Sequence, residues 1–394
     1  MEPSPRDDEI TFFAETTFRG DRRRFGIRRK DRRSHIYILG RTGMGKSTLL
    51  EILIASDLQA GNGLALLDPH GDLASRVLAH VPEERRADLI DFDPADRNVP
   101  YNPLRVSDPS RRYLVSSGLI SAFRKVWSES WGPRMEHILR HALLTLCEFP
   151  GSTLLDLPRL LTDPAFRRGV VGRVTDPQVR EFWRTEFDRY APHFRNEAIA
   201  PILNKVGAFL ASPVVREVVG DREASLDLRQ VIDEGKILIA NLSKGKLGED
   251  ASALLGALLV TGFECAALSR VDTPEAKRRD FYLYIDEVHN FATLSLADML
   301  PEARKYRLGM VLVSQYLEQL EEPIQRAILA NVGTLIAFRV GTRDAKVLAE
   351  EFFPEFSVED LVSLPRYHIY LRLMIDGVVS RGFSAITLPP HSHP

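Results

Sequence analysis

The sequence predicts an α/β fold in which helices separate the strands of a mostly parallel β-sheet and one all-helical segment interrupts it. Short apolar runs, rich in β-branched and aromatic residues, recur up to residue 92 and return after residue 237. From about residue 107 to residue 230 the strand patterns stop, and only helical spacing remains. A glycine-rich turn joins one early strand directly to a helix.

Strands are expected where a short apolar run lies between turn signals. Near the C-terminus, Tyr367–Met374 and Val378–Phe383 are predicted to form a β-hairpin through Asp376-Gly377, a dipeptide that favours a tight turn. The other expected strands are Ile10–Ala14, Ile36–Leu39, Leu64–Leu67, Leu89–Phe92, Ile237–Ala240, Phe281–Ile285, Met310–Val313 and Thr334–Phe338.

The helical segment contains one clear helix pattern. Apolar residues from Met135 to Leu146 recur at helical spacing, with Pro133 at the start. The three tryptophans of the chain, Trp127, Trp131 and Trp183, all lie in this segment. Their large rings are typical of core and interface packing, and a binding face is the alternative interpretation.

The charges of the chain are nearly balanced. Its 394 residues are 44% hydrophobic and carry a formal net charge of −2. This length is sufficient for about two domains with a sizeable core. Because the charge is near neutral, any contact with nucleic acid is expected to be local. Cys147 and Cys265 lie in apolar helical patterns and are expected as buried thiols of a reducing compartment, without a disulfide or metal framework.

No targeting segment is expected at the start of the chain, because Met1–Ile10 is polar and acidic. The longest apolar run, Ala253–Leu268, is interrupted by Thr261, Gly262 and Glu264. It is expected as a helix packed against a sheet and not as a membrane span. These features predict a cytoplasmic protein without direct membrane insertion.

The residues from Gly40 to Thr48 fit the phosphate-loop pattern G-x-x-x-x-G-K-[ST]. A predicted strand enters the loop and a predicted helix leaves it, as the motif requires. Its glycines let backbone N–H groups point at a polyphosphate, and the helix adds its positive N-terminal end. Lys46 supplies a cation for the β- and γ-phosphates, and the Ser47 hydroxyl supplies a Mg²⁺ ligand. The expected nucleotide-binding residues are Gly40, Thr42, Gly43, Gly45, Lys46, Ser47 and Thr48.

Two later strands end in polar residues that suit hydrolysis. The strand Phe281–Ile285 is followed by Asp286 and Glu287. Asp286 is expected to hold the Mg²⁺ shell, and Glu287 to polarise a water for attack on the γ-phosphate. The next strand ends at Gln315, whose amide is expected to contact the γ-phosphate or its water; a structural turn residue is the alternative.

An arginine supplied by a neighbour can stabilise the charge that develops during phosphoryl transfer, by about 10³–10⁵ in rate. Arg304 is the first candidate for this role, and Arg339 is the second. For either residue the alternative is a surface salt bridge.

Two further polar segments allow more than one interpretation. Residues 19–33 are dense in arginine, as in a patch that faces phosphate or nucleic acid, or in a solvated basic hairpin. Asp68, His70 and Asp72 follow a predicted strand. A polar turn beside the phosphates is expected there, and a metal site is the alternative.

With these residues in place, the chain resembles the FtsK/HerA branch of RecA-like motors, and within it the coupling proteins of type IV secretion, of the TraG/TraD kind, which act in conjugation. The resemblance runs over nearly the whole chain. It is carried by the phosphate loop and by the segments Leu67-Asp-Pro-His-Gly-Asp72, Tyr101-Asn-Pro-Leu104, Trp131-Gly-Pro-Arg-Met-Glu136, Ile285-Asp-Glu-Val-His-Asn-Phe291, Arg304-Lys-Tyr-Arg-Leu-Gly309 and Ser314-Gln315.

The resemblance implies a RecA-like nucleotide-binding domain in two parts, residues 1–106 and 231–394 with the closing hairpin, separated by an all-α insertion at residues 107–230. It implies a homohexameric ring that binds ATP and Mg²⁺ between subunits and DNA in a central channel. Arg304 occupies the place of an arginine that reaches the neighbouring nucleotide. The all-α domain is implied to meet relaxase or secretion-system proteins.

Membrane coupling proteins carry N-terminal transmembrane helices, and none is visible in this sequence. A peripheral place at the inner membrane, through a partner, is therefore an alternative to a purely cytoplasmic one. The favoured hypothesis is an ATP-hydrolysing DNA translocase in which Lys46, Glu287, Gln315 and Arg304 carry the chemistry. The rivals are a secretion ATPase that acts on protein cargo and a nucleotide-gated recruitment adaptor with little turnover.

Overall fold

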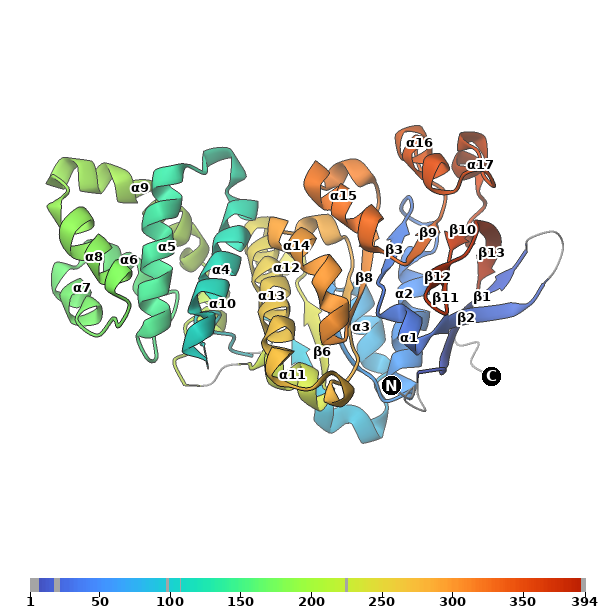
Figure 1. The fold of residues 1–394 in the computed structure, drawn as a ribbon, viewed down its shortest axis with the longest axis horizontal. Coiled ribbons are helices and arrows are strands. Elements are labelled where there is room, and N and C mark those ends of the chain that lie inside the picture. Colours follow the sequence, from blue (N-terminus) through green and yellow to red (C-terminus); the bar gives the residue numbers. More distant parts are fainter. Residues whose placement is uncertain (1–6, 18–21, 97–98, 107, 224–225, 391–394) are drawn as a thin grey trace. The chain divides into compact units, whose positions relative to one another are not determined.

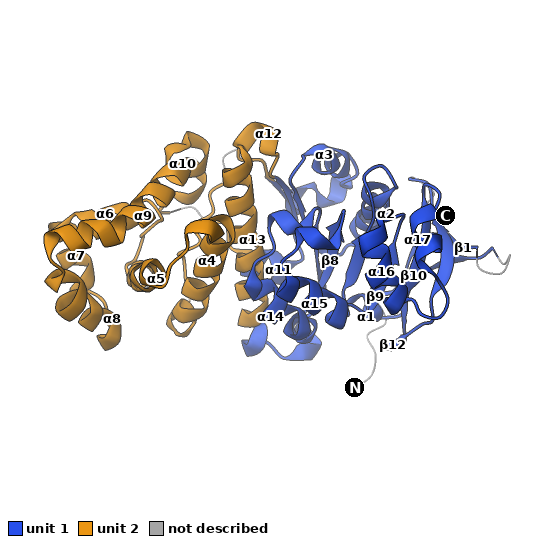
Figure 2. Ribbon diagram, turned by 90° about the horizontal axis from the view of Figure 1, so that it is seen from above, with its two compact units in different colours: residues 1–91, 229–241, 270–394 blue, residues 92–228, 242–269 orange. Residues whose placement is uncertain are grey.

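A computed structural model of the chain describes residues 7–17, 22–96, 99–106, 108–223 and 226–390. The polar start at residues 1–6 and part of the arginine-rich segment, residues 18–21, therefore lie outside the described residues. The structure divides into two compact units (Figure 2). Unit 1 comprises Met1–Asp91, Arg229–Asn241 and Arg270–Pro394, and unit 2 comprises Phe92–Leu228 and Leu242–Ser269.

Most strands join one 11-stranded sheet, in the order β2-β1-β13-β10-β9-β3-β8-β7-β4-β6-β5 (Figure 1). The apolar runs that the sequence marked as strands are found in strands, except that each of the two predicted C-terminal strands, Tyr367–Met374 and Val378–Phe383, is divided into separate strands. The strands are β1 (Ile10–Thr16), β2 (Arg24–Arg28), β3 (Ile36–Leu39), β4 (Gly63–Asp68), β5 (Leu89–Phe92), β6 (Ile237–Asn241), β7 (Phe281–Ile285), β8 (Leu308–Ser314), β9 (Thr334–Ala337), β10 (His368–Arg372), β11 (Met374–Ile375), β12 (Val378–Val379) and β13 (Phe383–Thr387).

The centre of the sheet is parallel, and one side is antiparallel. The strands β9, β3, β8, β7, β4 and β6 pair in parallel with their neighbours. At the β9 side, β10, β13, β1 and β2 continue the sheet as antiparallel pairs. The expected C-terminal hairpin is present only around its turn, where β11 pairs with β12 through Asp376 and Gly377, which both have positive φ. Most of its first predicted strand is β10, which instead pairs with β9 and β13 in the large sheet. Parallel strands end at the same edge, so the residues that follow β3, β4, β7 and β8 are brought together.

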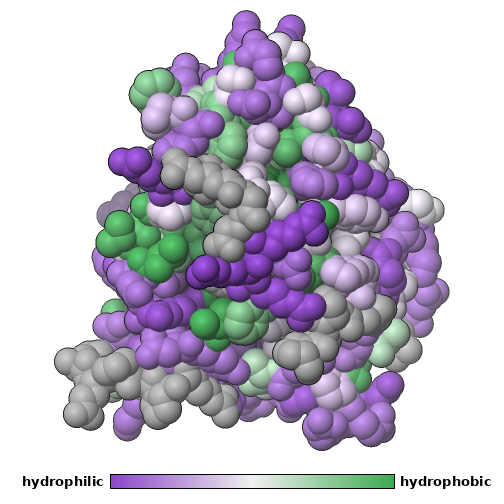
Figure 3. All heavy atoms as spheres, turned by 90° about the vertical axis from the view of Figure 1, so that its right-hand side faces the viewer, coloured by the Kyte–Doolittle hydropathy of each residue, from purple (hydrophilic) through white to green (hydrophobic). Residues whose placement is uncertain are grey.

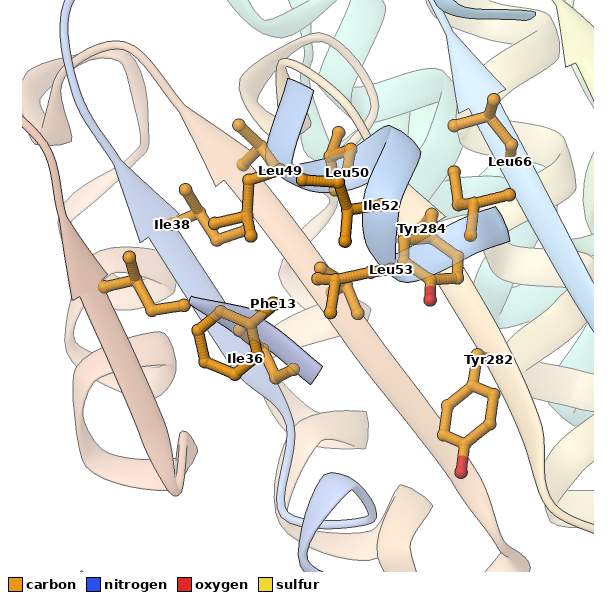
Figure 4. Close-up of a cluster of buried hydrophobic side chains, with 14 of the residues drawn as sticks. Phe13, Ile36, Ile38, Leu49, Leu50, Ile52, Leu53, Leu66, Tyr282 and Tyr284 are labelled. Atoms are coloured by element: carbon orange, nitrogen blue, oxygen red, sulfur yellow. The ribbon is translucent and has the colours of Figure 1, made fainter. Parts of the chain in front are cut away.

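The helix after the phosphate loop is central to the core of unit 1. In Figure 4, Leu49, Leu50 and Leu53 of α2 lie over Ile36 and Ile38 of β3. All five side chains are at most 1% exposed. The helices of this unit are α1 (Arg29–Arg32), α2 (Lys46–Gln59), α3 (Asp72–Ala79), α11 (Leu228–Glu234), α14 (Leu294–Ala303), α15 (Glu322–Asn331), α16 (Thr342–Glu351) and α17 (Val358–Ser363).

A buried ion pair fixes the far end of α2. The guanidinium of Arg32 donates to both carboxylate oxygens of Asp57, at 2.6 and 2.8 Å, and to the Tyr284 hydroxyl at 2.8 Å. The Tyr282 ring lies 3.7 Å below the guanidinium carbon. Both charged residues are at most 2% exposed. This pair therefore connects the phosphate-loop helix to β7, the strand that leads to Asp286.

The antiparallel side of the sheet ends at β2, whose Arg24 and Arg28 lie along the edge. Charged side chains on an edge strand oppose pairing with another chain. Figure 3 shows this side of the molecule, which is mainly hydrophilic with separate hydrophobic patches. The exposed apolar side chains on β1 and on the β11–β12 hairpin are Ile10, Phe12, Ile375, Val378 and Val379.

Unit 2 is helical throughout its described residues, apart from the end of β5. The predicted helix is present as α5, and Trp183 is fully buried, with its indole N–H donated to Thr145 at 2.7 Å. The short π-helix Phe182–Glu186 carries this tryptophan. The helices are α4 (Arg112–Val126), α5 (Pro133–Glu148), α6 (Asp156–Thr162), α7 (Pro164–Val171), α8 (Pro177–Glu181), α9 (Pro192–Ala211), α10 (Pro213–Val219), α12 (Lys244–Leu247) and α13 (Glu249–Ser269).

The long apolar helix α13 belongs to unit 2, although it follows β6 in sequence. It packs along α4, where a Cβ atom on Gly118 would approach Thr261 to 2.1 Å. Among the described residues, its segment Glu249–Asp272 is the one single helix long and apolar enough to cross a membrane. However, 72% of its most apolar stretch is buried inside the structure, as in a core helix. The helices α9 and α10 are together long and apolar enough to cross a membrane only if they are counted as one helix across a 98° bend.

Candidate functional site

The phosphate loop lies between β3 and α2, at the carboxyl edge of the parallel strands. Gly43 and Gly45 adopt φ values of +77° and +119°, which side chains other than glycine rarely adopt. With these two glycine conformations the loop turns and leads into Lys46, the first residue of α2. Among the described residues, no side chain caps this end of α2. The first N–H groups of the helix are therefore available to an anion.

Two aromatic rings support the loop from the β9 and β10 side. A Cβ atom on Gly40 would come within 2.5 Å of Phe338, and one on Gly45 within 2.7 Å of the Tyr367 ring. The Tyr367 N–H also donates to the Met44 carbonyl at 3.0 Å. These contacts give Gly40 and Gly45 a packing role in addition to their backbone freedom.

The ammonium group of Lys46 is buried and directed at the loop itself. It donates to the carbonyls of Gly40 and Arg41, at 2.6 and 3.2 Å. Burial lowers its pKa, and the nearby carboxylates of Glu287 and Asp286 oppose that shift. The structure gives no ion pair between Lys46 and a carboxylate in the described residues, so its charge is directed into a cradle of backbone groups that suits a polyphosphate.

Three carboxyl groups meet beside Lys46 at the ends of neighbouring strands. Asp68 is the last residue of β4, and Asp286 and Glu287 follow β7; these three residues are at most 6% exposed. Burial, reinforced by Asp68 and Glu287, raises the pKa of Asp286 to about 7. A divalent cation would relieve this crowding, so the carboxylates at this edge fit Mg²⁺; that Asp286 and Ser47 are its protein ligands stays a prediction.

Mg²⁺ typically keeps water and phosphate ligands and takes only one or two carboxylates from the protein. This agrees with a further observation: across the described residues, no group of three or more His, Cys, Asp or Glu side chains is arranged to hold a metal alone. The alternative metal site at Asp68, His70 and Asp72 is not formed. Asp68 instead accepts hydrogen bonds from the His70 and Ala74 N–H groups, at 2.8 and 2.9 Å, as in the expected polar turn.

The side chain of Gln315 connects the loop to Glu287. Its Nε2 donates to Glu287 Oε1 at 2.6 Å, and its Oε1 accepts from the Thr42 hydroxyl at 3.0 Å. A carboxylate can only accept, which fixes the orientation of the amide. Glu287 itself has φ +48°, a left-handed conformation that costs a non-glycine residue roughly 1–3 kcal/mol. Backbone strain of this kind at a buried carboxylate is typical of functional positions.

The two candidate arginines lie at opposite edges of the sheet. Arg304 is exposed and precedes β8, whereas Gln315 follows the same strand. Seven strand residues separate these edges by about 23 Å. Arg304 therefore does not reach the phosphate loop of its own chain. Arg339 follows β9, and its carbonyl accepts from the Arg41 N–H at 2.9 Å, so Arg339 lies beside the loop of its own chain.

The arginines of residues 24–33 are engaged by acidic residues. Arg29 and Arg33 both pair with Asp280, at 3.0 and 2.7 Å, and Arg24 pairs with Glu15 at 3.2 Å. Arg28 pairs with Asp376, and Arg32 is held in the buried pair with Asp57. These contacts are with carboxylates of the same chain, and Arg29, Arg32 and Arg33 are too buried for a solvated hairpin, so a structural role fits the described arginines better than either interpretation.

Sequence reasoning expected Asp68 in a polar turn beside the phosphates but did not place it against Asp286, and it missed the two aromatic side chains at the loop. Asp68 faces Asp286 because β4 and β7 are neighbours, with Leu67 in register with Ile285. The sequence shows that Asp68 ends a strand, but it does not show that this strand, β4, pairs with β7. Phe338 directly follows β9 and Tyr367 directly precedes β10, so nothing local in the sequence marks their contact with the loop.

Two family models match the chain. Residues 24–109 match the central domain of helicase HerA, and residues 236–363 match the DNA-binding domain of type IV secretion-system coupling proteins. No curated protein matches the sequence.

Solved structures of low sequence identity share the fold. The plasmid coupling protein TrwB, in complex with ADP and Mg²⁺, superposes with a TM-score of 0.65 and 18% identity, over 96% of this chain and 90% of that one. TrwB with the non-hydrolysable ATP analogue ADPNP gives 0.65 and 17%, over 96% and 91%. VirB4 of Thermoanaerobacter pseudethanolicus gives 0.60 and 14%, over 97% and 96%.

These findings confirm the predicted resemblance and the RecA-like fold with an all-α region. Parts of the chain match the models of the HerA central domain and of the coupling-protein DNA-binding domain, and the chain has the fold of the solved coupling-protein structures.

Proposed function

We propose that this protein is a ring-forming DNA translocase that hydrolyses ATP. The main support is the arrangement of the sheet edges. One edge holds the phosphate loop, the carboxylates of Asp286 and Glu287 and the amide of Gln315. Arg304 lies exposed at the other edge. A site built this way is incomplete within one subunit. It is completed when the Arg304 edge of a neighbouring copy faces it, as in a ring.

The roles of the residues follow from their positions. The backbone of the loop, with Lys46, binds the phosphates, and Ser47 and Asp286 hold Mg²⁺. Glu287 accepts the proton of the attacking water. Gln315 joins this base to the loop through Thr42, so loop and base are positioned together. Bound Mg²⁺ supplies positive charge against the developing charge on the phosphates.

Arg304 contributes from the neighbouring subunit. A guanidinium delivered to the transferred phosphoryl group is worth about 10³–10⁵ in rate. Arg339 lies beside the loop of its own chain and is better suited to contact the nucleotide of its own subunit. The family match over residues 236–363 supports DNA as the polymer that is moved.

ATP hydrolysis in the presence and absence of DNA tests this proposal. Wild-type protein should hydrolyse ATP faster with DNA, and Glu287→Gln should lower the rate about 10²- to 10⁴-fold while ATP still binds. Equal rates for wild type and Glu287→Gln would remove the base assignment. DNA affinity should also fall steeply with salt, because phosphate contacts release counterions.

The two rival functions give different results in the same assay. A secretion ATPase for protein cargo would hydrolyse ATP without a response to DNA. A recruitment adaptor would assemble on ATP and show negligible turnover. Either result would replace the translocase proposal.

A further inference from the structure

The two carboxylate oxygens of Glu287 have different surroundings. Oε1 accepts the hydrogen bond from Gln315, whereas Oε2 is buried and accepts no hydrogen bond from the described residues. His289 lies close to this second oxygen, with its Nδ1 3.4 Å from Oε2. His289 belongs to the short 3-10 helix Val288–Asn290 directly after Glu287.

The proton of His289 is placed by Gln319, in the short helix Leu317–Gln319 after β8. The Tyr316 N–H donates to Gln319 Oε1 at 3.2 Å, which leaves the Gln319 amide nitrogen facing His289 Nε2 at 3.3 Å. An amide nitrogen donates, so the neutral ring must accept at Nε2 and carry its proton on Nδ1. That proton is on the ring nitrogen that lies 3.4 Å from Glu287 Oε2, which is a close contact and not a hydrogen bond in this structure.

We propose that His289 is a positioning residue that holds Glu287 Oε2 while Gln319 fixes its tautomer. The proposal rests on the proposed function, in which Glu287 is the base. Gln315 holds one oxygen of the carboxylate and His289 the other, so the strained left-handed Glu287 is kept in a single orientation. The same contacts join the base to residues 316–319, where Tyr316 is 46% exposed. A partner that moves this turn would shift the base.

A matched pair of variants separates this role from simple packing. His289→Asn keeps a nitrogen donor close to the place of Nδ1, and His289→Gln keeps one close to the place of Nε2. His289→Gln should lower kcat about 10- to 100-fold with KM for ATP unchanged, and His289→Asn should retain most of kcat. If both variants lose kcat equally, or if KM rises instead, the proposal is wrong.

The Glu287→Gln background provides a second kinetic test. When the base is already absent, His289→Gln should slow the residual rate no further. A further loss of the same size would show that His289 acts elsewhere.

The tautomer can be measured without hydrolysis, by nitrogen NMR of protein labelled with ¹⁵N-histidine. Wild-type His289 should show its proton on Nδ1, and Gln319→Glu should move it to Nε2, because a carboxylate there can only accept. A proton on Nε2 in the wild type would overturn the proposal. If the wild type hydrolyses no ATP, the proposed function fails, and this measurement still decides how His289 is held.

Discussion

The phosphate loop and the arginine-rich segment at residues 24–33 differ in what their cations contact. Both contain positive charge in a pattern that phosphate could recognise. In the segment, Arg24, Arg29 and Arg33 pair with carboxylates. In the loop, Lys46 donates to backbone carbonyls and carries no carboxylate ion pair in the described structure. The number of positive side chains in a segment therefore does not indicate where phosphate binds. A cation that is not already paired with a carboxylate, such as Lys46, is the better indicator.

The physical reason is the free energy that each cation must spend to give up its existing contacts before it binds a phosphate. An arginine already held by a carboxylate must give up that pair before it can bind a phosphate. Lys46 exchanges only carbonyl contacts, and its burial makes a bound anion more favourable.

The largest expected effect is on stability, at the buried end of the arginine-rich segment. Arg32→Met leaves Asp57 as an uncompensated buried charge, and should destabilise the protein by about 3–5 kcal/mol. Urea unfolding measures the loss. A double variant, Arg32→Met with Asp57→Leu, should recover part of it, because the pair is then replaced by apolar groups. An unchanged midpoint in Arg32→Met would show that the pair is not structural.

The second effect concerns binding. Lys46→Ala should weaken ATP binding about 10- to 100-fold, because it removes a charge-assisted contact worth about 1.5–3 kcal/mol. The matched control is Arg24→Ala, which removes a half-exposed arginine paired with Glu15 and should leave ATP affinity unchanged. Titration calorimetry measures both. Comparable losses in the two variants would contradict the distinction between paired and available cations.

The third effect is a pH dependence at His35, where the arginine-rich segment passes into β3. Its ring is buried between the Leu300 carbonyl and the Met310 N–H, at 2.9 and 3.1 Å. Burial lowers its pKa to about 4. The unfolded chain, with a pKa near 6.5, binds the proton more readily, so stability falls as pH drops from about 6.5 toward 4.

The contribution of His35 to the free energy of unfolding should be about 2 kcal/mol smaller at pH 5 than at pH 7. Unfolding of wild type and His35→Asn at the two pH values measures it, since asparagine tolerates the left-handed φ of +63° at this position. The variant should be less stable at pH 7 and should lose less on acidification. An equal acid loss in both proteins would assign the effect to other groups.

The smallest effect is expected for exposed pairs of the arginine-rich segment. Arg24→Ala should change the free energy of unfolding by no more than about 0.5 kcal/mol, because surface salt bridges contribute little. A loss as large as that of Arg32→Met would show that burial does not separate the two arginines.

The sequence was sufficient for the strands and for the residues at their ends. Apolar runs such as Ile36–Leu39 and Phe281–Ile285 form strands because their side chains are buried on both faces, and parallel pairing then collects Lys46, Asp286 and Gln315 at one edge. Strand positions and the polar residues at strand ends can therefore be predicted from short stretches of sequence.

The parts that the sequence did not predict depend on contacts between distant residues. The antiparallel side of the sheet is built from β1, β2 and strands near the C-terminus. Tyr367 reaches Gly45 only through that pairing. His289 and Gln319 meet because β7 and β8 are neighbours, and their link fixes a tautomer that residue types alone do not specify. The placement of α13 with the helical unit is likewise a tertiary effect.

The central claim is that one subunit supplies the phosphate loop and its neighbour supplies Arg304. Mixing Arg304→Ala with Lys46→Ala protein tests it most directly, because Arg304→Ala subunits keep an intact loop and Lys46→Ala subunits keep the arginine. Each variant alone should be inactive, and the mixture should recover DNA-stimulated ATP hydrolysis at mixed interfaces. Two inactive variants whose mixture stays inactive would contradict the account.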